Sequence, residues 1–255
     1  MTDLWTGSAY DLHSHAQHAW GADVLARLEL PLDATVLDAG CGSGRVTEEL
    51  LRRFPTASVV AVDVSRSMLD QAHVRLTPHA DRVLLRQVDL EAGLPFDDRS
   101  FDAVLSTGAL HWVRDHGAFL AEAGRVLRPG GHLAVQCGGH GSLFSVHTIL
   151  AELGIDTAAH NHYATAEQTM TRLAAAGFTG SRAWLMDAPV SFTSTAEVEH
   201  FLAHAALQPY LADLPEPERR AVVHTVATRL DRPELDFVRL NMTATAPAAA
   251  TAPNA

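Results

Sequence analysis

The sequence has no lysine, only two cysteines and no apolar run long enough to span a membrane. Its 19 cationic side chains are all arginines, against 30 Asp and Glu, and the net charge is −11. This balance argues against a nucleic-acid groove, which requires clustered cations. Cys41 and Cys137 are too few for a disulfide scaffold and too far apart in the sequence for a zinc site.

The first residues, MTDLWTGSAYDLHSHAQ, carry acids and histidines where a signal peptide has a basic start and an apolar stretch. We therefore expect a cytoplasmic protein with neither nucleic acid nor a membrane as a partner, and the sequence does not indicate an oligomeric state. Hydrophobic residues make up 47% of the 255 positions. That is enough for one large domain or for a domain that carries a cap.

Short apolar runs typical of buried strands alternate with helical segments as far as residue 139. The expected strands are 35–40, 58–64, 82–90, 101–110 and 132–139. Ser65 is a suitable N-cap for the helix after the second strand. The alternation predicts right-handed crossovers and a parallel sheet that is covered on both faces.

The rhythm changes after residue 140. Helices are expected at 145–153, 165–176, 195–211 and 216–230, and strands at 181–192 and 235–244. The last of these strands alternates like an edge strand. The tail at 245–255 is low in complexity and is predicted to be disordered.

The stretch VLDAGCGSGRV at 36–46 joins a strand to a helix through three alternating glycines. A dinucleotide fingerprint would have its third glycine where Arg45 stands, whereas here the third glycine is Gly44. Asp38 would repel a pyrophosphate but favours a ligand with an ammonium group. The loop therefore predicts a ligand without phosphates and disfavours an NAD-dependent oxidoreductase.

In this order and spacing, the motifs resemble those of the class I S-adenosylmethionine-dependent methyltransferases. DAGCGSG at 38–44 is similar to their first motif, which wraps the methionine part of the cofactor. Asp63 stands where an acid binds both ribose hydroxyls, and Asp89 where an acid meets the adenine amino group. The resemblance implies S-adenosyl-L-methionine as cofactor, bound by Tyr10, Gln17, Asp38, Gly40, Gly42, Asp63, Val64, Met68, Asp89, Leu90 and Ser106.

The resemblance also implies an architecture. The fold is α/β and Rossmann-like, with a seven-stranded sheet in which six strands are parallel and the last is antiparallel. One methyltransferase domain is expected at 1–244, with N-terminal lid helices at 1–30 and a helical cap inserted at 193–234. Within the family, Tyr10 and the stretches at 109–116 and 133–136 resemble the trans-aconitate methyltransferases and their small-molecule relatives, which esterify a carboxylate.

His111 is the leading candidate for acceptor chemistry, because it follows the fourth strand at the carboxyl edge of the sheet, where open α/β folds bind ligands. It is a general base, an acceptor contact or a structural residue. His15, in the lid, is a second candidate that faces the acceptor. Its spacing from His13 and His18 suggests a metal, but no acid cluster or cysteine accompanies them, and we predict no metal site.

The cap should decide what the acceptor is. Its apolar positions, which include Phe201 and Tyr210, form either a core or the wall of an apolar acceptor pocket. A tricarboxylate would need convergent arginines. No arginine precedes Arg27, so the lid supplies none. The cap arginines, which are expected on solvated helix faces, are Arg219, Arg220, Arg229 and Arg232. The lack of convergent arginines disfavours aconitate itself as the acceptor.

The predicted function is methylation of a small molecule on an oxygen, in a carboxylate or in a hydroxylated secondary metabolite. C-methylation of an activated carbon is the close alternative. A protein that keeps the cofactor site but catalyses no transfer is another, because the cofactor residues are the same in both cases.

Overall fold

The structure is a computed structural model and describes residues 15–247. Tyr10 and residues 248–255 lie outside the described residues, and so do the predictions made for them. Among the helices of the described part, none is long and apolar enough to cross a membrane.

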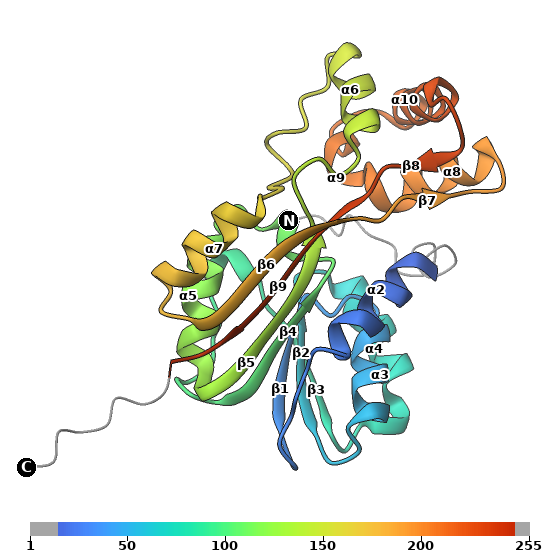
Figure 1. The fold of residues 1–255 in the computed structure, drawn as a ribbon. Coiled ribbons are helices and arrows are strands. Elements are labelled where there is room, and N and C mark those ends of the chain that lie inside the picture. The colour runs from blue at the N-terminus through green and yellow to red at the C-terminus, as the bar shows by residue number, and fades with distance from the viewer. Residues whose placement is uncertain (1–14, 248–255) are drawn as a thin grey trace, which may run out of the picture.

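A seven-stranded sheet forms the centre of the molecule, in the order β3-β2-β1-β4-β5-β9-β6 (Figure 1). Its strands are β1 (Thr35–Ala39), β2 (Ser58–Asp63), β3 (Val83–Gln87), β4 (Phe101–Thr107), β5 (Leu127–Gly138), β6 (Thr179–Asp187) and β9 (Val238–Thr245). The strands β1 to β5 pair in parallel, and β9 is antiparallel to both β5 and β6. The predicted Rossmann-like sheet with an antiparallel last strand is confirmed.

The last strand does not lie at the edge of the sheet, and that prediction was wrong. β9 pairs with β5 on one side and with β6 on the other, so β6 takes the edge. Alternation in a sequence reports how the two faces of a strand are covered and says nothing of its neighbours. β9 also runs through Thr245 and Ala246 is buried, so the ordered chain continues past the predicted start of the tail at 245.

Helices cover both faces of the sheet (Figure 1). One face carries α2 (His15–Leu25), α3 (Arg45–Arg53) and α4 (Arg66–Arg75), and the other carries α5 (His116–Val126) and α7 (Ala166–Ala175). Short 3-10 turns lie at Thr77–His79 (η1), Leu90–Ala92 (η2) and Leu110–Trp112 (η3). Leu50 and Leu69 are buried in the first layer and Phe119 and Leu120 in the second. Ser65 caps α4 as expected, because its Oγ accepts the Met68 N–H at 3.2 Å.

A cap stands beyond the carboxyl ends of the strands (Figure 1). It consists of α6 (Phe144–Glu152), β7 (Val190–Ser191), α8 (Thr195–Phe201), the π-helix η4 (Leu202–Ala206), α9 (Gln208–Leu211), α10 (Glu216–Arg229) and β8 (Glu234–Leu235). Leu150, Leu202 and Val226 belong to an apolar core that the cap forms for itself. Helix α6 contributes to this core from outside the expected 193–234 segment, so the cap is larger than the insertion.

Candidate functional site

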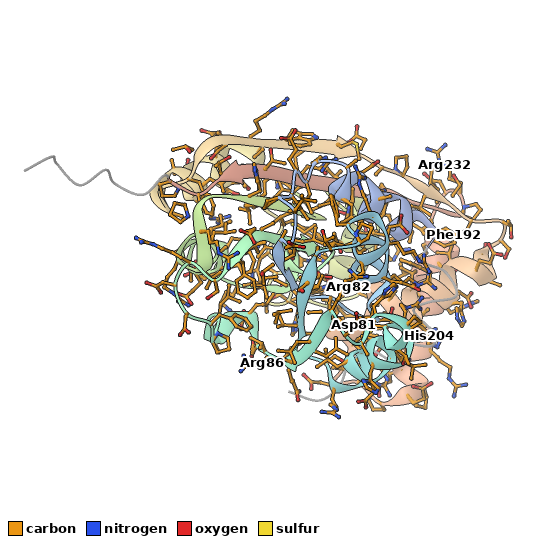
Figure 2. All side chains as sticks on the ribbon, turned by 90° about the horizontal axis from the view of Figure 1, so that it is seen from below. Asp81, Arg82, Arg86, Phe192, His204 and Arg232 are labelled. Carbon is orange, nitrogen blue, oxygen red and sulfur yellow. The ribbon has the colours of Figure 1, made fainter. Side chains whose placement is uncertain are left out.

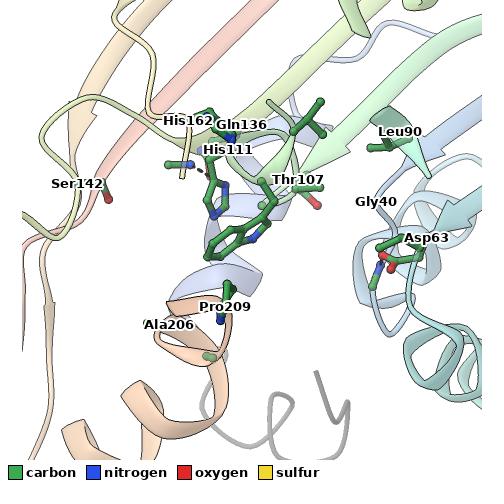
Figure 3. Close-up of a pocket in the computed structure, with 18 of the residues that line it drawn as sticks. Gly40, Asp63, Leu90, Thr107, His111, Gln136, Ser142, His162, Ala206 and Pro209 are labelled. Atoms are coloured by element: carbon green, nitrogen blue, oxygen red, sulfur yellow. Dashed lines mark hydrogen bonds between the residues drawn. The ribbon is translucent and has the colours of Figure 1, made fainter. Parts of the chain in front are cut away.

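A cavity of about 470 Å³ opens at the carboxyl ends of the central strands. It lies where the strand order reverses between β1 and β4, which is the usual ligand site of open α/β sheets. Gly40, Asp63 and Leu90 line what we term its loop side, and His111 and Ala206 line its cap side (Figure 3). The two sides belong to one continuous space, so two ligands bound there would meet.

The glycine loop turns β1 into α3 with left-handed backbone, at φ +82° for Gly40 and +53° for Gly42. The N–H groups of Gly40 and Cys41 donate to the Val62 carbonyl at 2.8 and 2.9 Å, which fixes the loop against β2. A Cβ at Gly40 would lie 2.2 Å from the Cβ of Ala109, whereas a Cβ at Gly42 would meet no atom within 4 Å. Gly42 therefore presents bare backbone to the cavity.

Asp63 ends β2 with its carboxylate in the cavity. Its Oδ2 accepts the Gly42 N–H at 2.9 Å and its Oδ1 accepts the Ser65 N–H at 2.9 Å. These two charge-assisted bonds fix the orientation of the carboxylate. A carboxylate accepts several hydrogen bonds, so an acid at this position suits the hydroxyls of a ligand.

Asp89 follows β3, the next strand end along this edge. Its Oδ1 accepts the Glu91 N–H at 3.0 Å and so caps the η2 turn. Seven of the predicted cofactor residues thus line the cavity together: Gly40, Gly42, Asp63, Val64, Met68, Asp89 and Leu90.

Asp38 and Ser106 do not line the cavity, which differs from the predicted cofactor contact. Both side chains are fully buried. Asp38 Oδ2 accepts the Thr47 hydroxyl at 2.6 Å, and burial raises the pKa of Asp38 to about 7 although the Thr47 bond opposes the rise. Ser106 Oγ donates to the Ala39 carbonyl at 2.7 Å. Because side chains alternate along a strand, Thr107 faces the cavity instead of Ser106.

His111 lies in the η3 turn directly after β4 (Figure 3). Its side chain is buried, and its Nδ1 accepts the Gly138 N–H at 3.3 Å. Burial lowers the pKa of His111 well below 6.5, and the charges of Arg239 and His116 lower it further. The ring is therefore neutral near neutral pH.

The other walls of the cap side come from segments that lie far apart in the sequence. Trp112 and Tyr163 stand beside His111, with ring centroids 4.6 and 5.8 Å from its own. Of the cap residues expected as core or wall, Phe201 lines the cavity and Tyr210 packs in the cap core. Further lining residues are Trp20, Ser142, Leu143, Ala205, Ala206, Pro209 and Phe237.

Arg239 is the site residue that the sequence analysis missed. It lies on β9 opposite Gly138, is 5% exposed and lines the cavity. Its guanidinium carbon is 4.3 Å from the centroid of a Trp20 ring. An arginine inside an apolar strand was the available signal, because buried arginines are rare without a specific role.

The cap arginines form ion pairs on the outside of the cap, in keeping with their predicted solvation. Arg232 is 75% exposed, pairs with Glu234 at 2.9 Å and lies at the outer end of the cap (Figure 2). Arg219 pairs with Glu216 at 3.1 Å, and Arg229 pairs with Glu152 across the cap.

The candidate residues near the N-terminus are described only in part. His15 and Gln17 fall within helix α2, where their backbone is described, and their side-chain contacts stay predictions. Trp20 and Gly21 of the same helix line the cavity, so α2 reaches the site. Among the described residues, no group of three His, Cys, Asp or Glu side chains is arranged to hold a metal ion.

The charges that line the cavity differ between its sides. The loop side has the carboxylates of Asp63 and Asp89, and the cap side has the cation of Arg239. Arg45, at the start of α3, and the exposed Arg114 also line the cavity. Bare backbone at a glycine, a carboxylate suited to ligand hydroxyls and a second carboxylate fit a cationic nucleoside such as S-adenosylmethionine.

Comparisons with known proteins agree with this geometry. Residues 37–135 match the model of a family described as a methyltransferase domain. Over 132 residues the chain is 39% identical to a trans-aconitate 2-methyltransferase of Variovorax paradoxus. The matched segment covers 52% of this chain and 49% of that protein. Over 178 residues the chain is 35% identical to a malonyl-[acyl-carrier protein] O-methyltransferase of Hahella chejuensis, with 68% and 61% covered. The chain thus spans about half to three fifths of the length of these relatives.

A solved structure extends the likeness to the whole fold. Phosphoethanolamine N-methyltransferase 2 of Haemonchus contortus, in complex with S-adenosyl-L-methionine, superposes with a TM-score of 0.61 at 21% identity, over 90% of this chain and 52% of that one. The chain therefore has the fold of a class I methyltransferase. Residues 37–135 match a methyltransferase domain, so the resemblance stated from the sequence is confirmed for the fold and for this segment.

Proposed function

We propose that the chain is an S-adenosylmethionine-dependent methyltransferase that acts on a small molecule. The methyl acceptor is an oxygen, in a carboxylate or a hydroxyl group of a metabolite or natural product. The observation that carries the proposal is the continuity of the cavity from the glycine loop to the cap. The O-methyltransferase name of the Hahella relative supports oxygen as the acceptor. A cytoplasmic location and a role in secondary metabolism stay predictions.

The proposed roles follow from the positions on the loop side. Asp63 binds the ribose hydroxyls, Asp89 meets the adenine amino group, and Val64 and Met68 flank the adenine. The bare backbone at Gly42 admits the methionine part. Residues 1–30, with Tyr10, His15 and Gln17, act as a lid. When bound, S-adenosylmethionine supplies a methyl carbon that its sulfonium activates.

The residues of the chain must position the acceptor for the transfer. Methyl transfer is an in-line displacement, so the protein must align the acceptor and exclude water. The apolar walls from Trp112, Phe201 and Pro209 exclude water from the cap side. Polar groups from Arg239 and His111 are available there to orient the acceptor.

Two measurements test the proposal. Calorimetry should show that S-adenosylhomocysteine binds and that NAD does not. Methyl-labelled S-adenosylmethionine is then offered with carboxylic acids, phenols and polyketide-like compounds, and the products are treated with base. Base-labile label means an ester, and base-stable label means an ether or a carbon–carbon bond. Cofactor binding without label on any compound contradicts transfer and favours the alternative without it, and preferential binding of NAD would favour an oxidoreductase.

A further inference from the structure

The tautomer of His111 bears on the choice between a carboxylate and a hydroxyl acceptor. Its Nδ1 accepts the Gly138 N–H at 3.3 Å, so this nitrogen offers a lone pair and carries no proton. The buried ring is neutral, and a neutral imidazole whose Nδ1 is unprotonated carries its proton on Nε2. In this state Nε2 donates a hydrogen bond and cannot take a proton from an acceptor.

Arg239 supplies a second donor on the same side. It is 5% exposed and faces Gly138 across the β5–β9 pairing. Gly138 is the residue whose N–H donates to His111. Its charge acts on the pKa of His111 and of Tyr163, which places all three side chains in one electrostatic neighbourhood. A buried guanidinium and an imidazole N–H together suit an anion that has two oxygens.

Much of the wall around these two donors is apolar. Trp20, Trp112, Phe201, Phe237, Ala206 and Pro209 present apolar or aromatic surface, and the other arginines that line the cavity among the described residues are Arg45 beside the glycine loop and the exposed Arg114. The Tyr163 hydroxyl hydrogen-bonds to Tyr210, whose oxygen also accepts the Asn161 amide at 3.0 Å. A second or third carboxylate on the acceptor would be buried against apolar walls at a cost of several kcal/mol.

We propose that the methyl acceptor is a monocarboxylic acid with an apolar body, whose carboxylate is bound by Arg239 and the Nε2–H of His111. This inference rests on the proposed methyl transfer and narrows its substrate. A bond forms between a carboxylate oxygen and the methyl carbon, the carbon–sulfur bond breaks, and its electron pair stays on sulfur. The carboxylate is already ionised near neutral pH, so no proton is released and His111 need not act as a base.

The binding test uses the chain saturated with S-adenosylhomocysteine. Calorimetry compares 4-phenylbutyrate with 4-phenylbutan-1-ol, which keeps the body and lacks the charge, and with trans-aconitate, which has three carboxylates. We expect the monocarboxylate to bind at least about tenfold more tightly than either. Methyl-labelled S-adenosylmethionine should then give a base-labile ester of the monocarboxylate.

Variants at the two donors separate their roles. Arg239→Gln should weaken 4-phenylbutyrate binding at least about tenfold and leave S-adenosylhomocysteine within about twofold, while Arg239→Lys should keep part of the affinity. His111→Gln retains an N–H donor at a similar reach and cannot act as a base, so its turnover should stay well above that of His111→Leu.

Several results would overturn the inference and leave methyl transfer standing. They are equal binding of the acid and its alcohol, base-stable label on the alcohol, tighter binding of trans-aconitate, and equal loss of turnover in His111→Gln and His111→Leu. Absence of binding by the monocarboxylate also overturns it. Failure of S-adenosylhomocysteine to bind contradicts the proposed function itself, so the two failures are distinguishable.

Discussion

On the loop side of the cavity the functional groups are carboxylates, bare backbone and Arg45, whereas on the cap side they are aromatic rings, small alanines, His111 and the buried Arg239. The loop side comes from consecutive strand ends between Gly40 and Leu90. The cap side combines residues from both ends of the chain, from Trp20 to Arg239. The loop side is built from segments close together in the sequence and has a motif. The cap side is built by tertiary contacts, and outside the stretch at 109–116 it has none.

The signs of the charges sharpen this comparison. A cationic methyl donor suits the side with Asp63 and Asp89, and an anionic acceptor suits the side with Arg239. Inside a partly buried cavity, such attractions are stronger than in bulk solvent. The ligands proposed for the two halves of the cavity therefore have opposite charge, and variants can be chosen that affect one half and spare the other.

The largest effect is expected at Asp38, beneath the glycine loop. Its pKa is raised to about 7 from 3.8, so the stability that its protonated form contributes is fully present below the lower value and is lost as the pH rises through the higher one. Asp38→Asn lacks this ionisation. The stability of Asp38→Asn relative to the parent should thus rise by up to about 4 kcal/mol between about pH 4 and pH 8.

Urea denaturation without cofactor, at several pH values, measures that change. Asp70→Asn makes the same change at an exposed position of α4 and is the matched control. A flat difference for Asp38→Asn would mean that the buried carboxylate is stabilised as an anion.

The second effect concerns the affinity for the cofactor. Asp63→Ala removes the acceptor for the N–H groups of Gly42 and Ser65 and the proposed ribose contact. S-adenosylhomocysteine should bind about 100-fold more weakly, because hydrogen bonds to a charged group contribute about 1.5–3 kcal/mol each. Calorimetry checks this, with the exposed Asp81→Ala (Figure 2) as control. Unchanged affinity would remove Asp63 from the cofactor site.

Two glycines of the loop should respond differently to the same added methyl group. Gly40→Ala combines a left-handed φ with a 2.2 Å approach to Ala109 and should cost about 2 kcal/mol of stability or more. Gly42→Ala has the left-handed φ without a contact and should cost about 1 kcal/mol, while its methyl group occupies cofactor space. Thermal melts and S-adenosylhomocysteine titrations separate the two. Equal destabilisation of the two variants would show that Ala109 moves away from the added methyl group at little cost.

The fold was largely predictable from local pattern. The strand expected at 35–40 is Thr35–Ala39 and the helix expected at 216–230 is Glu216–Arg229, because apolar period and turn residues determine such elements. The place of β9 inside the sheet was not predictable, since it depends on where the chain returns after β6.

The candidate site was likewise predictable from the sequence only in part. The resemblance to the methyltransferase motifs pointed to Asp63 and Asp89, and both line the cavity because parallel strand ends share one edge of the sheet. The alternation of side chains placed Ser106 beneath the loop and Thr107 in the cavity, which a motif does not resolve. Arg239 escaped notice because its burial follows from the β5–β9 register, and that register is a property of the folded sheet.

The smallest effect is expected in the π-helix, which forms part of the cap side. π-helical turns are rare and are frequent at functional sites, and this one brings Ala205 and Ala206 to the cavity while Ala203 stays outside it. Ala206→Leu should weaken binding of 4-phenylbutyrate about tenfold, as overpacking costs about 1–3 kcal/mol, and leave S-adenosylhomocysteine within about twofold. Ala203→Leu adds the same atoms at a half-buried position and should change neither affinity. An equal loss of both ligands in Ala206→Leu would mean that the two sides do not bind independently, because the cap would then shape the loop side as well.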